Sequence, residues 1–117
     1  MSYGKNLGWK IEYSEEVADD LRKLGRPAQQ RIKKFLEKLL VECGNPKERG
    51  EPYRGNLAGC WKYRTGSYRL ICKILDGEVI VLCVLMASHR SKSYAQKSIE
   101  DLLKRISELK AESLRDS

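Results

Sequence analysis

Two short turns divide residues 58–87 into three consecutive strand-like runs, and this meander constrains the fold more than any other stretch. The runs cover residues 58–64, 67–75 and 78–87, and the turns between them read Thr65-Gly66 and Asp76-Gly77. Two-residue loops that end in glycine favour tight hairpins, and Asp-Gly is among the strongest of these signals. We therefore predict three antiparallel strands joined by two tight turns.

These turns predict which residues face each other across the sheet. Lys62 is expected opposite Arg69, and Leu75 opposite Glu78. Opposite residues share a face, and side chains alternate along a strand, so both faces can be predicted. One face is predicted to carry Lys62, Arg64, Arg69, Lys73 and Arg90 together with Ile71, Leu82, Val84 and Met86. The other is predicted to collect Tyr63, Tyr68, Leu70, Cys72, Ile74, Val79, Val81, Cys83 and Leu85, with Trp61 if the first strand has no bulge.

The predicted pairing of Lys62 with Arg69 sets two like charges against each other, and such pairs repel. This arrangement needs either good solvation or an anionic partner. A basic surface exposed to water satisfies the first condition, and a phosphate-binding site satisfies the second. The alternation pattern alone leaves both interpretations open.

Composition narrows the class of protein and the class of partner. The 117 residues are 33% charged and 41% hydrophobic, which is typical of one soluble globular domain. A net charge of +7 favours polyanions as partners: nucleic acid, an anionic membrane surface or an acidic protein. The longest apolar run, 79–87, is too short to span a bilayer, and residues 1–6 lack a signal-peptide apolar region, so we expect a cytoplasmic protein.

The cysteine pattern gives no sign of a metal site. The chain has four cysteines without a C-x-x-C pair and a single histidine, so neither a zinc site nor any other metal site is expected. A structural disulfide is not expected either, because no secretion signal is present.

The remaining chain predicts helices around this meander. Residues 8–13 read as a strand, Ser14 as a helix N-cap, Gly25 as the end of that helix, and Pro27 as the first turn of a second helix. Residues 43–56 read as a loop, and 94–109 as a helix that covers the sheet or anchors a partner. We predict an α+β domain over 1–117, with 110–117 frayed. An N-terminal strand and helical hairpin pack on a small, mostly antiparallel four-stranded sheet, followed by a C-terminal helix. The first strand is expected beside the last or the first strand of the meander.

The chemistry available to this chain comes from Lys, Arg, Tyr and one His. No glycine-rich phosphate loop, H-E-x-x-H motif or Ser-His-Asp order is present. RNA cleavage suits such a set, because Lys and Arg can stabilise the charge on a pentavalent phosphorane. Tyr94 or His89 could serve as a base. A lone His beside an Arg is also typical of a structural or RNA-contacting residue, so both interpretations of His89 stay open.

Three motifs carry a resemblance to a known family: the stretch G-N-L-A-G-C-W-K-Y-R-T-G-S-Y-R-L over residues 55–70, D-G-E-V over 76–79, and His89-Arg90-x-x-x-Tyr94. With the helical hairpin before them and the helix after them, they resemble the RelE/ParE superfamily of bacterial toxins. The resemblance extends over about residues 9–109. It implies a type II toxin with a small, microbial-ribonuclease-like α/β fold.

The RelE-like branch of this superfamily implies an enzyme, a ribosome-dependent endoribonuclease that cleaves mRNA in the A site and inhibits translation. The resemblance implies metal-independent attack by the 2′-hydroxyl, and no cofactor. Lys62 and Arg64 would bind phosphate, and Arg69 would stabilise the transition state. Arg90 would act as acid or phosphate ligand, and Tyr94 as base or stacking residue. The predicted RNA contacts are Lys62, Arg64, Lys73, His89 and Lys92.

Partners follow from the same resemblance: a cognate antitoxin protein, the ribosome through its 16S rRNA, and mRNA, with no membrane. The ParE-like branch implies a DNA gyrase inhibitor without nuclease activity. Its members generally lack the full set of cations and tyrosine, so the residues present here favour the RelE-like branch. A plain RNA-binding module is a third possibility.

Overall fold

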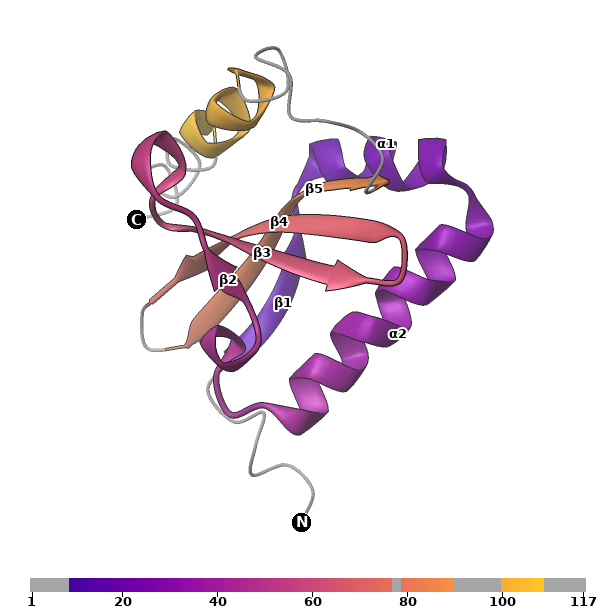
Figure 1. The fold of residues 1–117 in the computed structure, drawn as a ribbon, viewed down its shortest axis with the longest axis horizontal. Coiled ribbons are helices and arrows are strands. Elements are labelled where there is room, and N and C mark those ends of the chain that lie inside the picture. Colours follow the sequence, from indigo (N-terminus) through magenta and orange to yellow (C-terminus); the bar gives the residue numbers. More distant parts are fainter. Residues whose placement is uncertain (1–8, 77–78, 90–99, 109–117) are drawn as a thin grey trace.

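A five-stranded sheet organises the structure, a computed structural model that describes residues 9–76, 79–89 and 100–108. The strand order is β1-β5-β4-β3-β2, and the meander β3-β4-β5 forms its centre (Figure 1). The α+β class predicted from the sequence is confirmed. The strands are β1 (Trp9–Tyr13), β2 (Glu51–Pro52), β3 (Cys60–Thr65), β4 (Tyr68–Leu75) and β5 (Ile80–His89).

The two outer strands complete the sheet in different ways. β1 pairs with β5 in parallel, so the first strand lies beside the last strand of the meander. β2 is a two-residue strand that pairs antiparallel with β3, placing Glu51 opposite Lys62. The predicted sheet had four strands and no β2, because two residues between Gly50 and Tyr53 carry no alternating pattern. They form a strand only because β3 offers its free edge.

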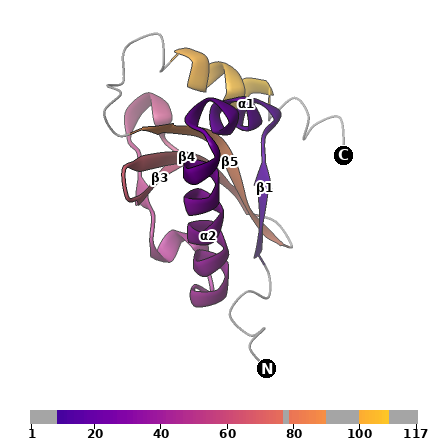
Figure 2. The ribbon, with the colours of Figure 1, turned by 90° about the vertical axis from the view of Figure 1, so that its right-hand side faces the viewer.

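A helical hairpin covers one face of the sheet. Helix α1 (Glu15–Leu24) begins after Ser14, whose Oγ accepts the backbone N–H of Val17 at 3.2 Å. Gly25 ends it with a φ of 94°, and α2 (Arg26–Glu42) follows with Pro27 in its first turn. These boundaries match those predicted from the cap residues. Both helices lie on the same side of the sheet (Figure 2).

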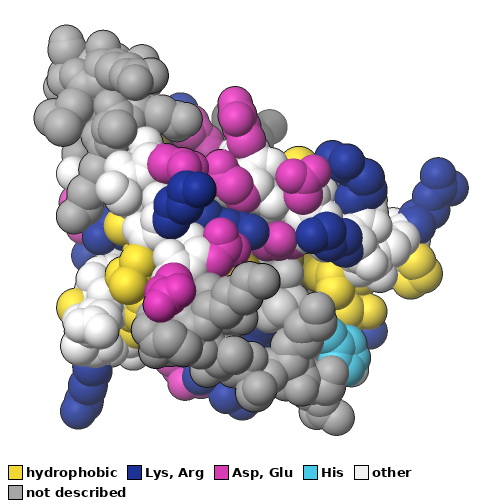
Figure 3. All heavy atoms as spheres, turned by 90° about the horizontal axis from the view of Figure 1, so that it is seen from above, with side chains coloured by type: hydrophobic (Ala, Val, Ile, Leu, Met, Phe, Trp, Pro, Cys, Tyr) yellow, Lys and Arg dark blue, Asp and Glu magenta, His cyan; other side chains and the backbone are white. Residues whose placement is uncertain are grey.

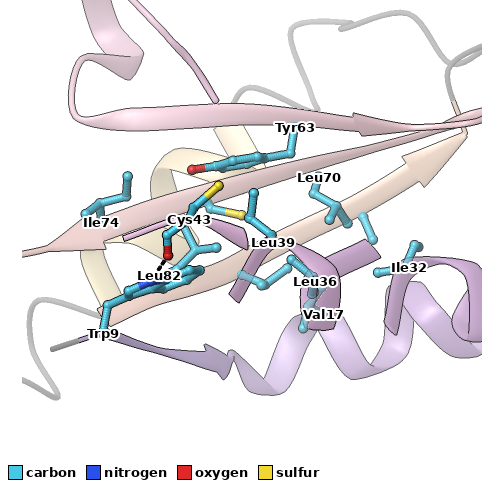
Figure 4. Close-up of a cluster of buried hydrophobic side chains, with 13 residues drawn as sticks. Trp9, Val17, Ile32, Leu36, Leu39, Cys43, Tyr63, Leu70, Ile74 and Leu82 are labelled. Atoms are coloured by element: carbon cyan, nitrogen blue, oxygen red, sulfur yellow. Dashed lines mark hydrogen bonds between the residues drawn. The ribbon is translucent and has the colours of Figure 1, made fainter. Parts of the chain in front are cut away.

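The principal core lies between this hairpin and the sheet. Leu36 and Leu39 of α2 are 1% exposed and pack against Leu70 of β4 and Leu82 of β5 (Figure 4). At one end the indole Nε1 of Trp9 donates to the carbonyl oxygen of Cys43 at 2.9 Å, which ties β1 to the end of α2. The hydrogen bond satisfies the polar atom of an otherwise buried ring.

The first hairpin of the meander has a different register from the predicted one. Thr65 pairs with Tyr68, so the loop is Gly66-Ser67, and Arg64 lies opposite Arg69. Gly66 has a φ of 58° at the first loop position, as a type II′ turn requires. The predicted pairing of Lys62 with Arg69 is therefore wrong by two positions. Because two is the period of a strand, every face assignment in β3 and β4 still holds.

The second hairpin departs further from the prediction. Leu75 pairs with Val81, so the connection is longer than the predicted Asp76-Gly77 loop and shifts β5 by an odd number of residues. Leu82 and Val84 consequently face the helical hairpin, not the cations. A bulge between the pairs Ile71–Met86 and Cys72–Val84 restores the predicted alternation. The odd shift places Val81 and Cys83 on the face predicted for the cations, and Leu85 at the bulge also lies there, contrary to the prediction. Met86, beyond the bulge, lies on that face as predicted.

A third helix, over residues 100–108, covers part of that second face. Leu102 is 1% exposed and packs in a second, smaller hydrophobic cluster, separate from the principal core. The predicted helix at 94–109 thus covers the sheet in its described part. Ile71 belongs to the same cluster as Leu102, whereas Leu82 and Val84 belong to the principal core. The buried members of the cluster are Cys60, Ile71, Cys83, Leu85, Met86 and Leu102.

Candidate nucleic-acid interface

Four cations of β3 and β4 lie on the sheet face opposite α1 and α2, and we call this set the cationic face: Lys62, Arg64, Arg69 and Lys73. Strand alternation places them there, because the residues between them point into the principal core. Trp61 and Tyr63 flank Lys62, and both pack in that core. Arg64 and Arg69 form a directly opposed pair across β3 and β4. Two guanidinium groups in register repel each other, so an anion bound between them would lower their energy.

Lys62 is already partly neutralised within the fold. Its Nζ lies 3.6 Å from Oε2 of Glu51 on β2, and 5.9 Å from the ring centroid of Tyr53. The Lys62 side chain is 19% exposed, whereas that of Glu51 is 66% exposed. Arg64, in contrast, is exposed and makes no ion pair with any described residue. Arg64 is therefore the more available of these two cations for an external phosphate.

Lys73 lies at the other end of the cationic face, opposite Cys60. A β-carbon on Gly59 would clash with its Nζ, so the ammonium packs closely over the backbone there. Burial raises the pKa of the Cys60 thiol, and the nearby Lys73 charge only partly opposes this. All four cysteines are buried, and none of them forms a disulfide. Cys60 consequently remains a protonated thiol at neutral pH and is not a nucleophile.

His89 lies on the opposite side of the sheet from the cationic face. It pairs with Tyr68 across β4 and β5, and the two rings meet edge to face with centroids 5.6 Å apart. Ser88, not His89, occupies the position opposite Arg69. The predicted RNA-contacting His89 therefore joins a different set of residues from Lys62, Arg64, Arg69 and Lys73. The predicted residues Arg90, Lys92 and Tyr94 lie outside the described part of the chain.

A cleft beside the first hairpin turn brings together residues that the sequence did not single out. It has a volume of about 260 Å³ and is lined by Pro27 and Arg31 of α2 and by Gly66, Ser67 and Tyr68. Tyr68 was predicted for the core face, and it is half-buried there. The sequence signal was weak: an arginine on the polar side of a helix and an aromatic residue directly after a turn.

Tyr63 has a structural role beneath this surface. Its hydroxyl donates to the carbonyl oxygen of Pro46 at 2.7 Å, and its ring meets Phe35 edge to face. Burial raises the pKa of Tyr63 well above its ordinary value. Tyr63 therefore holds the loop before β2 against the sheet and does not act as a base.

Negative charge gathers at another part of the molecule. Seen from above, Asp and Glu side chains cluster over α1 and the helix at 100–108 (Figure 3). The described residues contain no group of three or more His, Cys, Asp or Glu side chains arranged to hold a metal ion. Within the same residues, no helix has the length and apolarity needed to cross a membrane. Lys and Arg side chains lie among these acids in the same view, so this end of the molecule carries both signs of charge (Figure 3).

The family of the chain follows from a comparison with known proteins. Residues 11–94 match the family model described as the ParE toxin of type II toxin-antitoxin systems, parDE. The chain belongs to this toxin family. The match covers the whole meander and the helical hairpin, and it confirms the resemblance to the RelE/ParE superfamily.

RelE proteins are also similar to this toxin. The mRNA interferase toxin RelE of Escherichia coli K12 is 26% identical over 93 residues, which are 77% of this chain and 94% of RelE. The RelBE2 toxin-antitoxin complex of Mycobacterium tuberculosis contains a chain with a TM-score of 0.59 and 29% identity, covering 72% of this chain and 100% of that one. The structure of an arginine-to-alanine double mutant of E. coli RelE in the free state has a TM-score of 0.62 and 27% identity. The match covers 86% of this chain and 99% of the RelE chain. The toxin is therefore RelE-like in sequence and fold.

Proposed function

We propose that this toxin is an endoribonuclease that cleaves mRNA in the ribosomal A site and thereby inhibits translation. The observation that carries the proposal is the opposed pair Arg64 and Arg69 on the cationic face. A phosphodiester between them would gain two charge-assisted contacts and relieve their repulsion. The E. coli relative is named an mRNA interferase, which supports the same activity here.

The proposed reaction needs no metal ion. The 2′-oxygen forms a bond to phosphorus while the bond to the 5′-oxygen breaks, leaving a cyclic phosphate and a 5′-hydroxyl. Arg64 and Arg69 would stabilise the extra negative charge on the phosphorane, and stabilisation of this kind often contributes most to the rate enhancement of an enzyme. Lys62 and Lys73 would hold flanking phosphates. The proton transfers are assigned to Arg90 and Tyr94 by resemblance, with His89 as the other candidate base.

The partners are part of this proposal. The ribosome would place the A-site codon on the cationic face and contribute contacts through its 16S rRNA, so we place the toxin in the cytoplasm. A neighbouring structure is a toxin-antitoxin complex, which supports a cognate antitoxin here. The antitoxin would neutralise the toxin by covering the cationic face or by displacing the helix at 100–108.

Mapping of mRNA 5′ ends after induction of the toxin in cells tests this function. Cuts in phase with codons are expected, and they should disappear with the double substitution Arg69→Ala and Arg90→Ala. Lys34→Ala, which changes an exposed cation of α2 on the other side of the sheet, serves as the matched control and should cut as the unchanged toxin does. Intact mRNA on induction of a toxic protein would contradict the proposal.

The match to the ParE model favours one alternative, a DNA gyrase inhibitor without nuclease activity. The two functions separate in a single purified assay. A gyrase inhibitor would reduce DNA supercoiling by gyrase at equimolar toxin and leave programmed ribosomes intact, whereas an mRNA interferase would do the reverse.

A further inference from the structure

We infer that the cleft between α2 and the β3–β4 turn binds one unstacked nucleotide of single-stranded RNA. The base would stack on Tyr68, and the guanidinium of Arg31 would contact the base or its phosphate. This inference rests on the proposed function, because it extends the RNA path from the cationic face across the tip of the hairpin. The ligand class is single-stranded RNA, from either mRNA or rRNA.

The turn glycine shapes the cleft. Gly66 has a φ of 58° and no side chain, and a β-carbon there would clash with Nε of Arg31. The guanidinium of Arg31 therefore packs directly over the turn, next to the Tyr68 ring that lines the same cleft. The volume of about 260 Å³ is open to solvent on one side and is lined by few residues. A planar group that enters it meets a cation and an aromatic ring.

Both side chains are available for a ligand. Arg31 makes no hydrogen bond or ion pair with a described residue, although it packs closely on the protein. Tyr68 packs against the principal core, and its ring lies nearly perpendicular to that of His89, with 5.6 Å between the centroids. A ring fixed in this way loses little conformational entropy when a base stacks on it. Arginine adds planar stacking and two-pronged phosphate binding.

The cleft and the cationic face lie on opposite sides of the sheet but at the same end of the β3–β4 hairpin. Tyr68 and Arg69 are consecutive in β4, so their side chains point to opposite faces of the sheet at the same end of the hairpin. Arg69 faces Arg64, and the turn Gly66-Ser67 separates them from the cleft. We infer that a strand of RNA with one phosphate at Arg64 and Arg69 crosses the tip of this hairpin, the β3–β4 turn, to place the next base in the cleft.

The chemistry favours RNA over an acidic peptide. A peptide carboxylate would pair with Arg31 but gain nothing particular from the Tyr68 ring. Aromatic rings and arginine planes that stack on splayed bases are the usual means by which proteins hold single-stranded RNA. The cleft itself has no acidic lining residue, because Pro27, Arg31, Gly66, Ser67 and Tyr68 line it.

Equilibrium binding of a fluorescein-labelled, 2′-O-methyl oligoadenylate tests the inference without any cleavage. Tyr68→Leu and Arg31→Ala are each expected to raise the Kd by about fivefold to a hundredfold, the range for one base stack. Tyr68→Phe keeps the ring and should bind as the unchanged toxin does. Lys33→Ala removes one exposed charge from the same helix outside the cleft and should change the Kd by less than about threefold.

Several results would overturn the inference: no binding of the oligonucleotide by the unchanged toxin, or equal affinities for Tyr68→Leu, Arg31→Ala and Lys33→Ala. Thermal melts of each variant identify a loss of folding. If Tyr68→Leu unfolds, the Kd of Arg31→Ala alone tests whether the cleft binds RNA. If mRNA stays intact in cells while Tyr68→Leu weakens RNA binding, the nuclease proposal fails and this inference stands. If mRNA is cut but the cleft variants bind normally, the inference alone fails.

The source of the nucleotide is decided by an abasic mRNA on programmed ribosomes. If the base belongs to mRNA, an abasic residue next to the A-site codon should lower the cleavage rate of the unchanged toxin. The same abasic mRNA should not lower the already reduced rate of Tyr68→Leu any further. If the base belongs to rRNA, the unchanged toxin should cut the abasic mRNA at its normal rate, whereas Tyr68→Leu should cut both mRNAs slowly. Equal cleavage by the unchanged toxin and Tyr68→Leu on both mRNAs would count against the cleft in either role.

Discussion

Asp20 of α1 and Arg105 of the helix at 100–108 form a two-pronged ion pair that covers the open edge of β5. The Nη1–Oδ2 and Nη2–Oδ1 distances are 2.8 and 3.2 Å, and the Arg105 and Asp20 side chains are only 11% and 15% exposed. Arg105 Nη1 also donates to the carbonyl of Leu85 at 2.7 Å, while the amide of Ala87 donates to Asp20 at 3.0 Å. β1 ends before this point, so the pair replaces the missing strand at the bulge.

We predict that this pair stabilises the fold and the docking of the last helix. Burial opposes the charged form of Arg105, but the hydrogen bond and charge of Asp20 outweigh it and raise its pKa. Arg105 also pairs with Asp101 at 3.1 Å, but the Asp101 side chain is 49% exposed, so removal of Asp20 leaves the nearly buried guanidinium with only an exposed partner. Asp20→Asn should lower the free energy of unfolding by about 3 kcal/mol, measured by urea denaturation.

A control on the same helix separates burial from charge. Asp19 pairs with Arg22 at 2.8 Å, but these side chains are 62% and 75% exposed. Asp19→Asn should cost no more than about 0.5 kcal/mol. The double variant Asp20→Asn with Arg105→Met should lose less stability than Asp20→Asn alone. If Asp19→Asn and Asp20→Asn lowered the free energy of unfolding equally, the buried ion pair would contribute no more to stability than the exposed one.

Arg64→Gln is predicted to improve stability and impair function together. Removal of one of two opposed arginines relieves repulsion, so the free energy of unfolding should rise by about 0.5 kcal/mol at low salt. RNA cleavage on programmed ribosomes should fall about a hundredfold. Thermal melts at two ionic strengths and single-turnover cleavage measure the two effects. A stable variant with full activity would remove Arg64 from the phosphate site.

Glu51→Gln is predicted to strengthen RNA binding. Glu51 lies 3.6 Å from the Lys62 ammonium and competes with phosphate for it. Without that carboxylate, the affinity for single-stranded RNA should rise by about twofold to fivefold, because an ion pair with one largely exposed partner is worth up to about 1 kcal/mol. The measurement is the Kd as a function of salt. Glu48→Gln, a nearby exposed carboxylate that bonds Gly44 and Asn45, is the control. Equal affinities for the two variants would place Lys62 away from the RNA.

Alkaline pH is predicted to destabilise the toxin through its buried acids. Burial raises the pKa of Cys72 well above its ordinary 9.0, and burial likewise raises that of Tyr63. Above the ordinary values, the unfolded chain releases protons that the folded chain keeps. Stability is therefore full below about pH 9 and falls as pH rises, by up to about 1.4 kcal/mol per unit for each group.

Urea denaturation at pH 8 and pH 10 under reducing conditions measures this loss. Cys72→Ala is less stable at pH 8 because it leaves a small cavity, but it should lose less stability between the two pH values than the unchanged toxin. An identical loss in both proteins would mean that Cys72 does not contribute.

Strand alternation explains why much of the cationic face could be predicted. Lys62, Arg64 and Arg69 were assigned to one face from a register that was wrong by two positions, and the assignment survived because two positions is one full strand period. The same reasoning failed for Leu82 and Val84, because the loop after Leu75 is longer by an odd number. Loop length beyond the two-residue turns has no clear signature in sequence.

The sequence by itself determined the local features: the Ser14 cap, the Gly25 break, the alternation of β3 and β4, and the motif that identifies the toxin family. These depend on neighbours along the chain. Only the tertiary structure decided the bulge in β5, its cover by Asp20 and Arg105, and the meeting of Arg31 with the hairpin turn. Those features join residues that are far apart in sequence, and their energies come from contacts that exist only once the sheet and helices have packed.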